Sequence, residues 1–305
     1  MRKIYGIGET VFDIIFKDGQ PRVAKAGGAM LNSAVSLGRI GLPVHFISEY
    51  GNDEVGDIIN QFLNTNGVNT GFVNRFGDGK TKLALAFLDE NNNDGYSFYE
   101  KYPAERLSTG FPEIRKDDIL LYGSIYAITD QIRSRFISFV RTASDNGGML
   151  LYDPNFRSAH LSELEMVRPL IIENMASSVI LRGSDEDFLN IFGARDADEA
   201  WEEVRKYTGC LVYTASTKGV YVRTAGFSGT FPVKRITPVS TIGAGDNFNA
   251  GMIAALYRKG ISREEVGSMG EEKWAEVIAM GVGFATNVCL SYENYISEEF
   301  AASLR

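Results

Sequence analysis

The chain has 305 residues, of which 44% are apolar, and its 31 basic and 39 acidic side chains give a net charge of −8. This length and apolar content suit one large domain, or a core with a smaller appendage, and argue against a disordered chain. The acidic balance, without any basic block, argues against nucleic acid as the main partner.

The start of the chain alternates like a strand and lacks the apolar core of a signal peptide, and no apolar run approaches the roughly 20 residues of a membrane span. The two cysteines, Cys210 and Cys289, have no metal-type spacing and form no disulfide framework. With only His45 and His160, chemistry that relies on a histidine base or a histidine-rich metal site is not expected. We therefore expect a cytoplasmic protein without membrane contact.

Short apolar runs alternate with longer helical patterns along the chain. The expected strands are 3–8, 44–48, 119–123, 149–153, 178–182 and 211–215. Helical patterns include 29–40, ended by Gly41, and 53–66, ended by Gly67. This alternation predicts an α/β fold with a doubly wound, mostly parallel sheet covered by helices on both faces. Ligands of such sheets usually bind at the carboxyl ends of the strands.

Two segments interrupt this alternation. Residues 11–26 and 81–100 read as β-hairpins, each turning at a polar loop that contains glycine. We expect them to form a small β-sheet that stands off the main body as a lid. The predicted organisation is one domain over 1–305, with lid segments of about 11–26 and 76–106 inserted in it.

Two nucleotide-binding motifs are incomplete. The stretch FGDGKT (76–81) ends like a phosphate-binding P-loop, but Asn74 stands where that motif needs its first glycine and a strand-like run follows. The stretch GIGE (6–9) carries only part of a dinucleotide fingerprint. An NAD-dependent oxidoreductase remains an alternative that rests on this second element alone.

The stretch STIGAGDNFNAG (240–251) places small residues and one acid where a helix begins. Backbone N–H groups at a helix start point outward, and small residues let them close around an anion. The amides of Ala244, Gly245 and Asp246 could therefore hold a phosphate while Asp246 accepts a proton from an attacking hydroxyl. An ordinary capped turn is the other interpretation of Gly243 and Asp246.

The chain resembles sugar kinases of the ribokinase, or PfkB, family. The family's C-terminal signature, D-T-x-G-A-G-D-x-F-x-x-G, is matched by Thr241, Gly243, Ala244, Gly245, Asp246, Phe248 and Gly251. Its N-terminal signature resembles GGAMLNSAVSLGRIG (27–41), and GNDEVGD (51–57) and DPNFR (153–157) also match. The two signatures lie more than 200 residues apart and in the family's order.

The resemblance implies roles for residues near the sugar. Asp246 would be the base that takes the proton of the sugar hydroxyl, and the backbone of 243–246 would form the anion hole. Asp13 would accept hydrogen bonds from sugar hydroxyls. The sugar would also contact Gly27, Gly28 and Asn32, although Asn32 could instead lie on a solvated helix face. Arg157, after the strand that ends in Asp153, could contact the transferring phosphate or a sugar oxygen.

The resemblance further implies ATP and Mg²⁺ as cofactors. TASTKG (214–219) resembles the family's T-x-G-x-x-G nucleotide loop through Thr214 and Gly219, with Ser216 where glycine is usual. SDED (184–187) resembles the Asn-x-x-Glu motif that orders magnesium and phosphate, with Ser184 and Asp187 in those places. Asp187 could hold Mg²⁺ through water, or both residues could simply cap a helix.

One departure concerns potassium. Ser240 stands where the family has an Asp that helps bind an activating monovalent cation, and NVCLSYENYIS (287–297) lacks the expected Gly-Ala pair. Activation by K⁺ is therefore in doubt.

The sugar is suggested by FYEKYPAERL (98–107), which resembles a fructokinase stretch and makes Tyr99 a candidate sugar contact. Fructose is the first choice; ribose and 2-keto-3-deoxygluconate are alternatives, as is a non-catalytic sugar-binding protein on the same scaffold. Lids of this kind often pair between subunits, so a homodimer through the lid is plausible.

Overall fold

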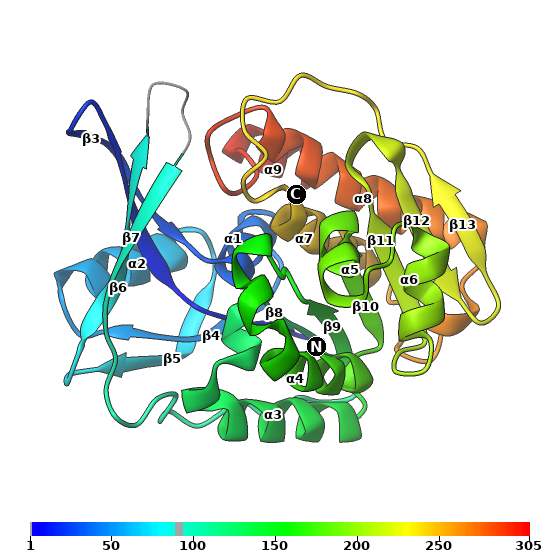
Figure 1. Cartoon of the computed structure of the whole chain (residues 1–305), viewed down its shortest axis with the longest axis horizontal. Helices are drawn as coiled ribbons and strands as arrows, with labels where there is room; N and C mark the ends of the chain where they lie inside the picture. The colour runs from blue at the N-terminus through cyan, green and yellow to red at the C-terminus, as the bar shows by residue number, and fades with distance from the viewer. Residues whose placement is uncertain (1, 89–93) are drawn as a thin grey trace.

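The computed structural model describes residues 2–88 and 94–305 (Figure 1). The turn expected between the strands of the second hairpin falls on 89–93, outside the described residues. Both predicted sheets are present. Within the described part of the chain, no helix is long and apolar enough to cross a membrane.

The large sheet has the strand order β13-β12-β11-β10-β9-β8-β1-β4-β5. The strands from β5 to β11 in this order are parallel, whereas β12 and β13 are antiparallel additions at one edge. Their bounds are β1 Ile4–Ile7, β4 Val44–Gly51, β5 Asn69–Phe76, β8 Ile119–Gly123, β9 Met149–Asp153, β10 Ile180–Ser184, β11 Cys210–Thr214, β12 Val220–Thr224 and β13 Ser228–Phe231. The expected strands are confirmed; β5, β12 and β13 were not expected.

Helices cover both faces of this sheet. Their bounds are α1 Ala29–Arg39, α2 Glu54–Thr65, α3 Asp130–Asp145, α4 Leu164–Ser177, α5 Asp185–Phe192, α6 Ala197–Val204, α7 Ala244–Arg258, α8 Glu271–Cys289 and α9 Glu298–Leu304. Alternate strand residues enter two separate cores. On β9, Met149 and Leu151 pack with α1, α7 and α8, whereas Leu150 and Tyr152 pack with α3 to α6. The doubly wound α/β prediction is therefore confirmed.

The small sheet has the order β3-β2-β6-β7 and stands beside the main body (Figure 1, left). Its strands are β2 Val11–Lys17, β3 Gln20–Gly27, β6 Lys80–Leu88 and β7 Asp94–Lys101. The hairpins join through a parallel pairing of β2 with β6, in which Phe12 lies opposite Leu83. Because β2 follows β1 and β3 leads into α1, this sheet is anchored at the carboxyl edge of the large sheet.

Candidate active site

Helix α7 begins at the carboxyl edge of the large sheet. Its N-cap, Gly243, has φ +78°, a left-handed conformation that favours glycine, and a Cβ there would lie 2.9 Å from the carbonyl oxygen of Asn294. Asp246 lies in the first helical turn. The amide of Ala244 already donates to the carbonyl of Thr241, so the amides of Gly245 and Asp246 are the better candidates to hold an anion.

Helix α1 holds the Asp246 carboxylate. Asn32 Nδ2 donates to Asp246 Oδ2 at 2.8 Å, and the Ser33 hydroxyl donates to the Asp246 backbone oxygen at 2.7 Å. Burial raises the pKa of Asp246 to about 6, while the amide of Asn32 opposes the rise; nearby Asp153 raises the pKa further, and Arg157 and Arg182 lower it. A carboxylate with this pKa is mostly deprotonated at neutral pH and basic enough to accept a proton.

Arg182 lies directly beside the start of α7. A Cβ added to Gly245 would come within 2.9 Å of Arg182 Nη1, so the guanidinium occupies the space that this glycine leaves open. Arg182 Nη1 donates to Asp153 Oδ2 at 2.8 Å, and Nη2 donates to Thr214 Oγ1 at 2.8 Å. Asn249 Nδ2 reaches the same Asp153 oxygen at 2.6 Å. A buried, fixed positive charge therefore adjoins the proposed anion hole.

Arg182 was missed by the sequence reasoning. The available signal was an arginine at the end of the run SVILR, separated from the SDED motif by Gly183, where a buried strand would normally carry an apolar side chain. Asp153, which the sequence analysis placed at the end of a strand and in the DPNFR match without a role of its own, is the counter-charge of Arg182 and is 1% exposed.

Asp13 lies against the glycines that precede α1. A Cβ on Gly27 would approach Asp13 Oδ2 to 2.4 Å, and a Cβ on Gly28, whose φ is +133°, would approach the Glu9 carbonyl oxygen to 2.2 Å. Burial raises the pKa of Asp13 to about 6, and Lys25 opposes the rise. The lack of a side chain at Gly27 therefore lets the Asp13 carboxylate, which can accept from hydroxyls, lie directly against the backbone that leads into α1. Among the described residues, Asn32 Oδ1 is buried without a hydrogen-bond partner and is free to accept from a ligand hydroxyl.

The predicted nucleotide residues lie at or just after the ends of β10 and β11. Ser184 and Asp187 form a capping box at the start of α5: the Ser184 hydroxyl and amide donate to Asp187 Oδ2 at 2.6 and 2.7 Å. Asp187 Oδ1 accepts from the Phe156 amide at 2.5 Å. Ser216 has φ +48°, which explains why the related loop prefers glycine there, and Gly219 has φ +121°. Thr214 bonds Arg182, as described above.

This donor set suits Mg²⁺ in an outer coordination sphere. Both Asp187 oxygens already accept hydrogen bonds, as do both Asp153 oxygens. No group of three or more His, Cys, Asp or Glu side chains that could hold a metal occurs in residues 2–88 and 94–305. Mg²⁺ keeps several waters and binds readily to substrate phosphates, so Asp187 would act through water.

Two predicted residues lie away from this cluster of contacts. Arg157 is exposed, and its side chain has no hydrogen bond or ion pair within the part of the chain that the structure describes, although it is near enough to lower the pKa of Asp246. Tyr99 is 59% exposed on β7 and lines a groove of about 560 Å³ between the small sheet and the start of α2. A contact of Tyr99 with sugar stays a prediction.

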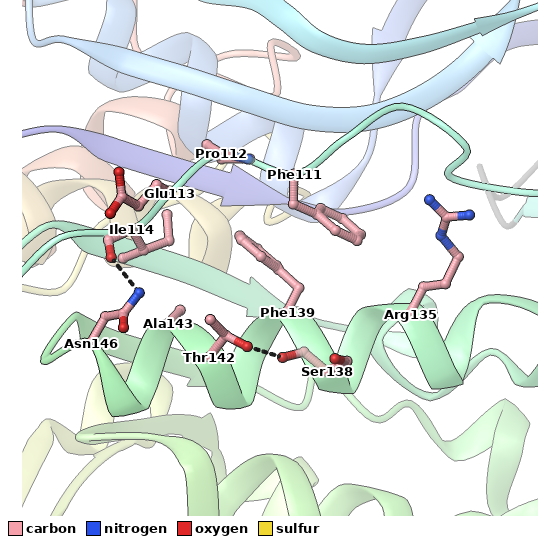
Figure 2. A pocket seen from close by; sticks show the side chains of 10 residues that line it. All are labelled: Phe111, Pro112, Glu113, Ile114, Arg135, Ser138, Phe139, Thr142, Ala143 and Asn146. Atoms are coloured by element: carbon pink, nitrogen blue, oxygen red, sulfur yellow. Dashed lines mark hydrogen bonds between the residues drawn. The ribbon is translucent and has the colours of Figure 1, made fainter.

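A separate surface hollow, shown in Figure 2, lies between the 111–114 segment and α3, where Phe111 stacks on Phe139 at 4.5 Å. Its residues precede β8 and β9, so it lies at the amino edge of the sheet. Asp246 and Arg182 lie at the opposite edge, and this hollow is therefore not part of the candidate site.

The sequence of this chain is similar to those of known proteins. The model of the pfkB family carbohydrate kinases matches residues 1–300. A probable chloroplastic fructokinase-6 of Arabidopsis thaliana is 32% identical over 246 residues, covering 77% of this chain and 64% of the relative. A probable fructokinase-5 of the same plant is 28% identical and covers 88% of this chain and 87% of the relative.

Solved structures share the fold. The fructokinase of Vibrio cholerae O395 with fructose, ADP and calcium ion bound has a TM-score of 0.83 at 20% identity, covering 100% of this chain and 99% of that one. The aminoimidazole riboside kinase of Salmonella enterica, complexed with its riboside and an ATP analogue, has a TM-score of 0.83 at 22% identity, covering 99% of this chain and 98% of that one.

Proposed function

Because the chain belongs to the pfkB family of carbohydrate kinases, we propose that it transfers the γ-phosphoryl group of ATP to a hydroxyl of fructose, with Asp246 as the base. The choice of fructose is supported by the names of its relatives in plants and in Vibrio alginolyticus. The observation that carries the mechanism is the position of Asp246: a carboxylate of raised pKa in the first turn of α7, beside Arg182.

Each of these residues has its own role in the phosphoryl transfer. Asp246 accepts the proton of the attacking hydroxyl, the bond from that oxygen to the γ-phosphorus forms, and the bond from phosphorus to the leaving oxygen of ADP breaks. Asn32 keeps the carboxylate oriented throughout. The start of α7 and Arg182 stabilise the charge on the phosphoryl oxygens. Mg²⁺, when bound with the nucleotide, neutralises phosphate charge.

Asp13, Gly27 and Gly28 would hold the sugar. We propose that the small sheet closes over it and excludes water, which suppresses hydrolysis of ATP. The exposed residues Val23, Phe87, Phe98 and Tyr99 lie on this sheet, and β3 and β7 are its edges. Exposed apolar side chains beside open edges favour a dimer through the small sheet. Light scattering during gel filtration of wild type and Phe87→Glu tests this contact.

The cytoplasm is the proposed compartment. Cys210 and Cys289 are both free thiols, as expected where thiols stay reduced.

A coupled ADP-release assay with ATP, Mg²⁺ and a panel of fructose, ribose, aminoimidazole riboside and 2-keto-3-deoxygluconate tests the proposed reaction. We expect fructose to give the highest kcat/KM. A higher value with another sugar would overturn the choice of substrate and keep the chemistry. Sugar binding by calorimetry without any turnover would favour a non-catalytic sugar-binding protein.

A further inference from the structure

The side chain of Asn247, the residue directly after Asp246 on α7, is buried and bonds three other parts of the chain. Asn247 Nδ2 donates to the Gly243 carbonyl at 2.8 Å and to the Asn294 carbonyl at 2.7 Å. Its Oδ1 accepts from the Ser36 hydroxyl of α1. The family's signature leaves the place after Asp246 open, so the resemblance gives no role to this amide. A buried polar side chain with several bonds nevertheless needs an explanation.

The orientation of the Asn247 amide is fixed by its partners. Backbone carbonyls only accept hydrogen bonds, so those of Gly243 and Asn294 require the nitrogen of Asn247 to face them. Ser36 Oγ accepts from the Ile296 amide at 3.1 Å, which leaves the proton of Ser36 for Asn247 Oδ1. Both polar atoms of the side chain are thus used. The amide joins α1, the start of α7 and the segment that follows α8.

The bond to Gly243 bears on the proposed anion hole. The Gly243 carbonyl and the Ala244 amide belong to one planar peptide unit, so fixing this carbonyl also fixes how the helix begins. Glycine has the most backbone freedom to lose on folding, and this start contains Gly243 and Gly245. The Gly243 carbonyl accepts from the Asn247 backbone amide at 2.9 Å, and the side chain adds a second bond to the same oxygen. Asn247 therefore restrains the most flexible part of the site.

We propose that Asn247 is a positioning residue for phosphoryl transfer: it holds Gly243 so that the amides of Gly245 and Asp246 already face the γ-phosphoryl group when ATP binds. Preorganised donors stabilise developing charge without rearranging during the reaction, so poorer alignment lowers the rate. Because Asn247 is 0% exposed, it acts through Gly243 and not by contact with a substrate. This inference rests on the proposed function and adds a residue to the same site.

Asn247→Ala removes the bonds to both carbonyls and to Ser36. We expect kcat/KM for ATP to fall at least about tenfold, while the KM for fructose stays within about twofold. The matched control is Asn174→Ala on α4, which packs on the opposite face of the large sheet from α7. Asn174 is also 0% exposed, and its Oδ1 accepts from Arg133 Nη1 at 2.7 Å. This control should lose stability in urea and keep both kinetic quantities within about twofold of wild type.

Ser36→Ala is a milder variant of the same network. It removes one hydroxyl and leaves the Asn247 side chain in place without its fixed donor. We expect kcat/KM for ATP to fall about threefold, again with the KM for fructose within about twofold.

Calorimetry without sugar separates positioning from a purely structural role. Each protein is titrated, in the presence of Mg²⁺, with ADP and with the β,γ-imido analogue of ATP, because only the analogue carries a γ-phosphoryl group. The ratio of the Kd of the analogue to that of ADP should rise about tenfold in Asn247→Ala and about threefold in Ser36→Ala. It should stay unchanged in Asn174→Ala.

An unchanged ratio in well-folded Asn247→Ala would overturn the inference. If that variant does not fold, an unchanged ratio in Ser36→Ala would do so. A matching rise of the ratio in Asn174→Ala would also overturn it, because loss of stability alone would then explain the effect. If wild type phosphorylates no sugar, the proposed function fails, and the nucleotide ratio still decides the inference.

Discussion

Replacing Asp246 with Asn removes the proposed base and keeps its shape. The amide oxygen of the new side chain can still accept from Asn32, which lies 2.8 Å from Asp246 Oδ2, so the start of α7 should keep its geometry. Loss of a general base costs about 10²- to 10⁴-fold in rate. We therefore expect kcat to fall by that factor, with the KM for ATP nearly unchanged.

The pH dependence of the wild type gives a second measure of the same group. With the pKa of Asp246 raised to about 6, kcat/KM should rise through pH 6 and level off above about pH 7, with roughly one tenth of the plateau value at pH 5. The residual rate of Asp246→Asn should lack this rise. Because burial also raises the pKa of Asp13 to about 6, Asp13→Asn must be measured alongside, and it should retain the limb caused by Asp246.

The coupled assay for ADP release, run from pH 5 to 9 in constant ionic strength, measures both quantities. Asp198→Asn, an exposed carboxylate paired with Arg223, is the control and should match wild type. An Asp246→Asn variant that keeps more than about a tenth of the wild-type kcat would refute the assignment of Asp246 as base. An acid limb that persists unchanged in that variant would refute its link to this carboxyl.

Four further outcomes are expected. Gly245→Ala should lower kcat/KM for ATP at least about tenfold, because the new Cβ would meet Arg182 at 2.9 Å; Gly270→Ala, which has open space around it, is the control in the same assay. Arg182→Met should lower the free energy of unfolding in urea by about 3 to 5 kcal/mol, since buried Asp153 loses its counter-charge. The pKa of Asp246 is higher in the folded than in the unfolded protein, so this carboxyl contributes stability at pH 4 that is lost as the pH rises through 6. Above pH 6, Asp246→Asn should therefore raise Tm relative to wild type, and this increase in Tm should vanish near pH 4. Replacing K⁺ by tetramethylammonium should change turnover by less than about twofold if Ser240 has abolished the cation site, whereas K⁺ dependence would contradict that interpretation.

The alternation of strands and helices made the fold predictable, because a doubly wound sheet buries its central strands on both faces as continuous apolar runs. Runs such as ILLYG (119–123) and MLLYD (149–153) have this form and became β8 and β9. By contrast, β13 is four residues long and reads SGTF, which has too little apolar pattern to stand out. Edge strands of this kind are specified mainly by their neighbours.

The site was predictable where one stretch carries the chemistry and harder where contacts are long-range. The place of Asp246 at the start of a helix follows from the GAGD sequence, whereas its proposed role as a base also needed the resemblance to the family. The bond between Asn32 and Asp246 joins residues 214 positions apart, and the sequence predicted Asn32 as a sugar contact without indicating this partner. Arg182 could not be assigned to the site because its importance depends on Gly245 and Asp153, which the fold brings to it.

The segment that touches Gly243 also makes the site depend on residues that lie far apart in the sequence. The carbonyl of Asn294 accepts from the Asn247 side chain at 2.7 Å and closes over the start of α7. Asp13 and Asn32, in contrast, belong to the first tenth or so of the chain. The two walls of the site therefore come from segments more than 260 residues apart in the sequence, and neither segment forms the site without the other. Truncation before Asn294 should remove the contact that closes over the start of α7, and we expect a chain shortened in this way to lose phosphorylation of sugar.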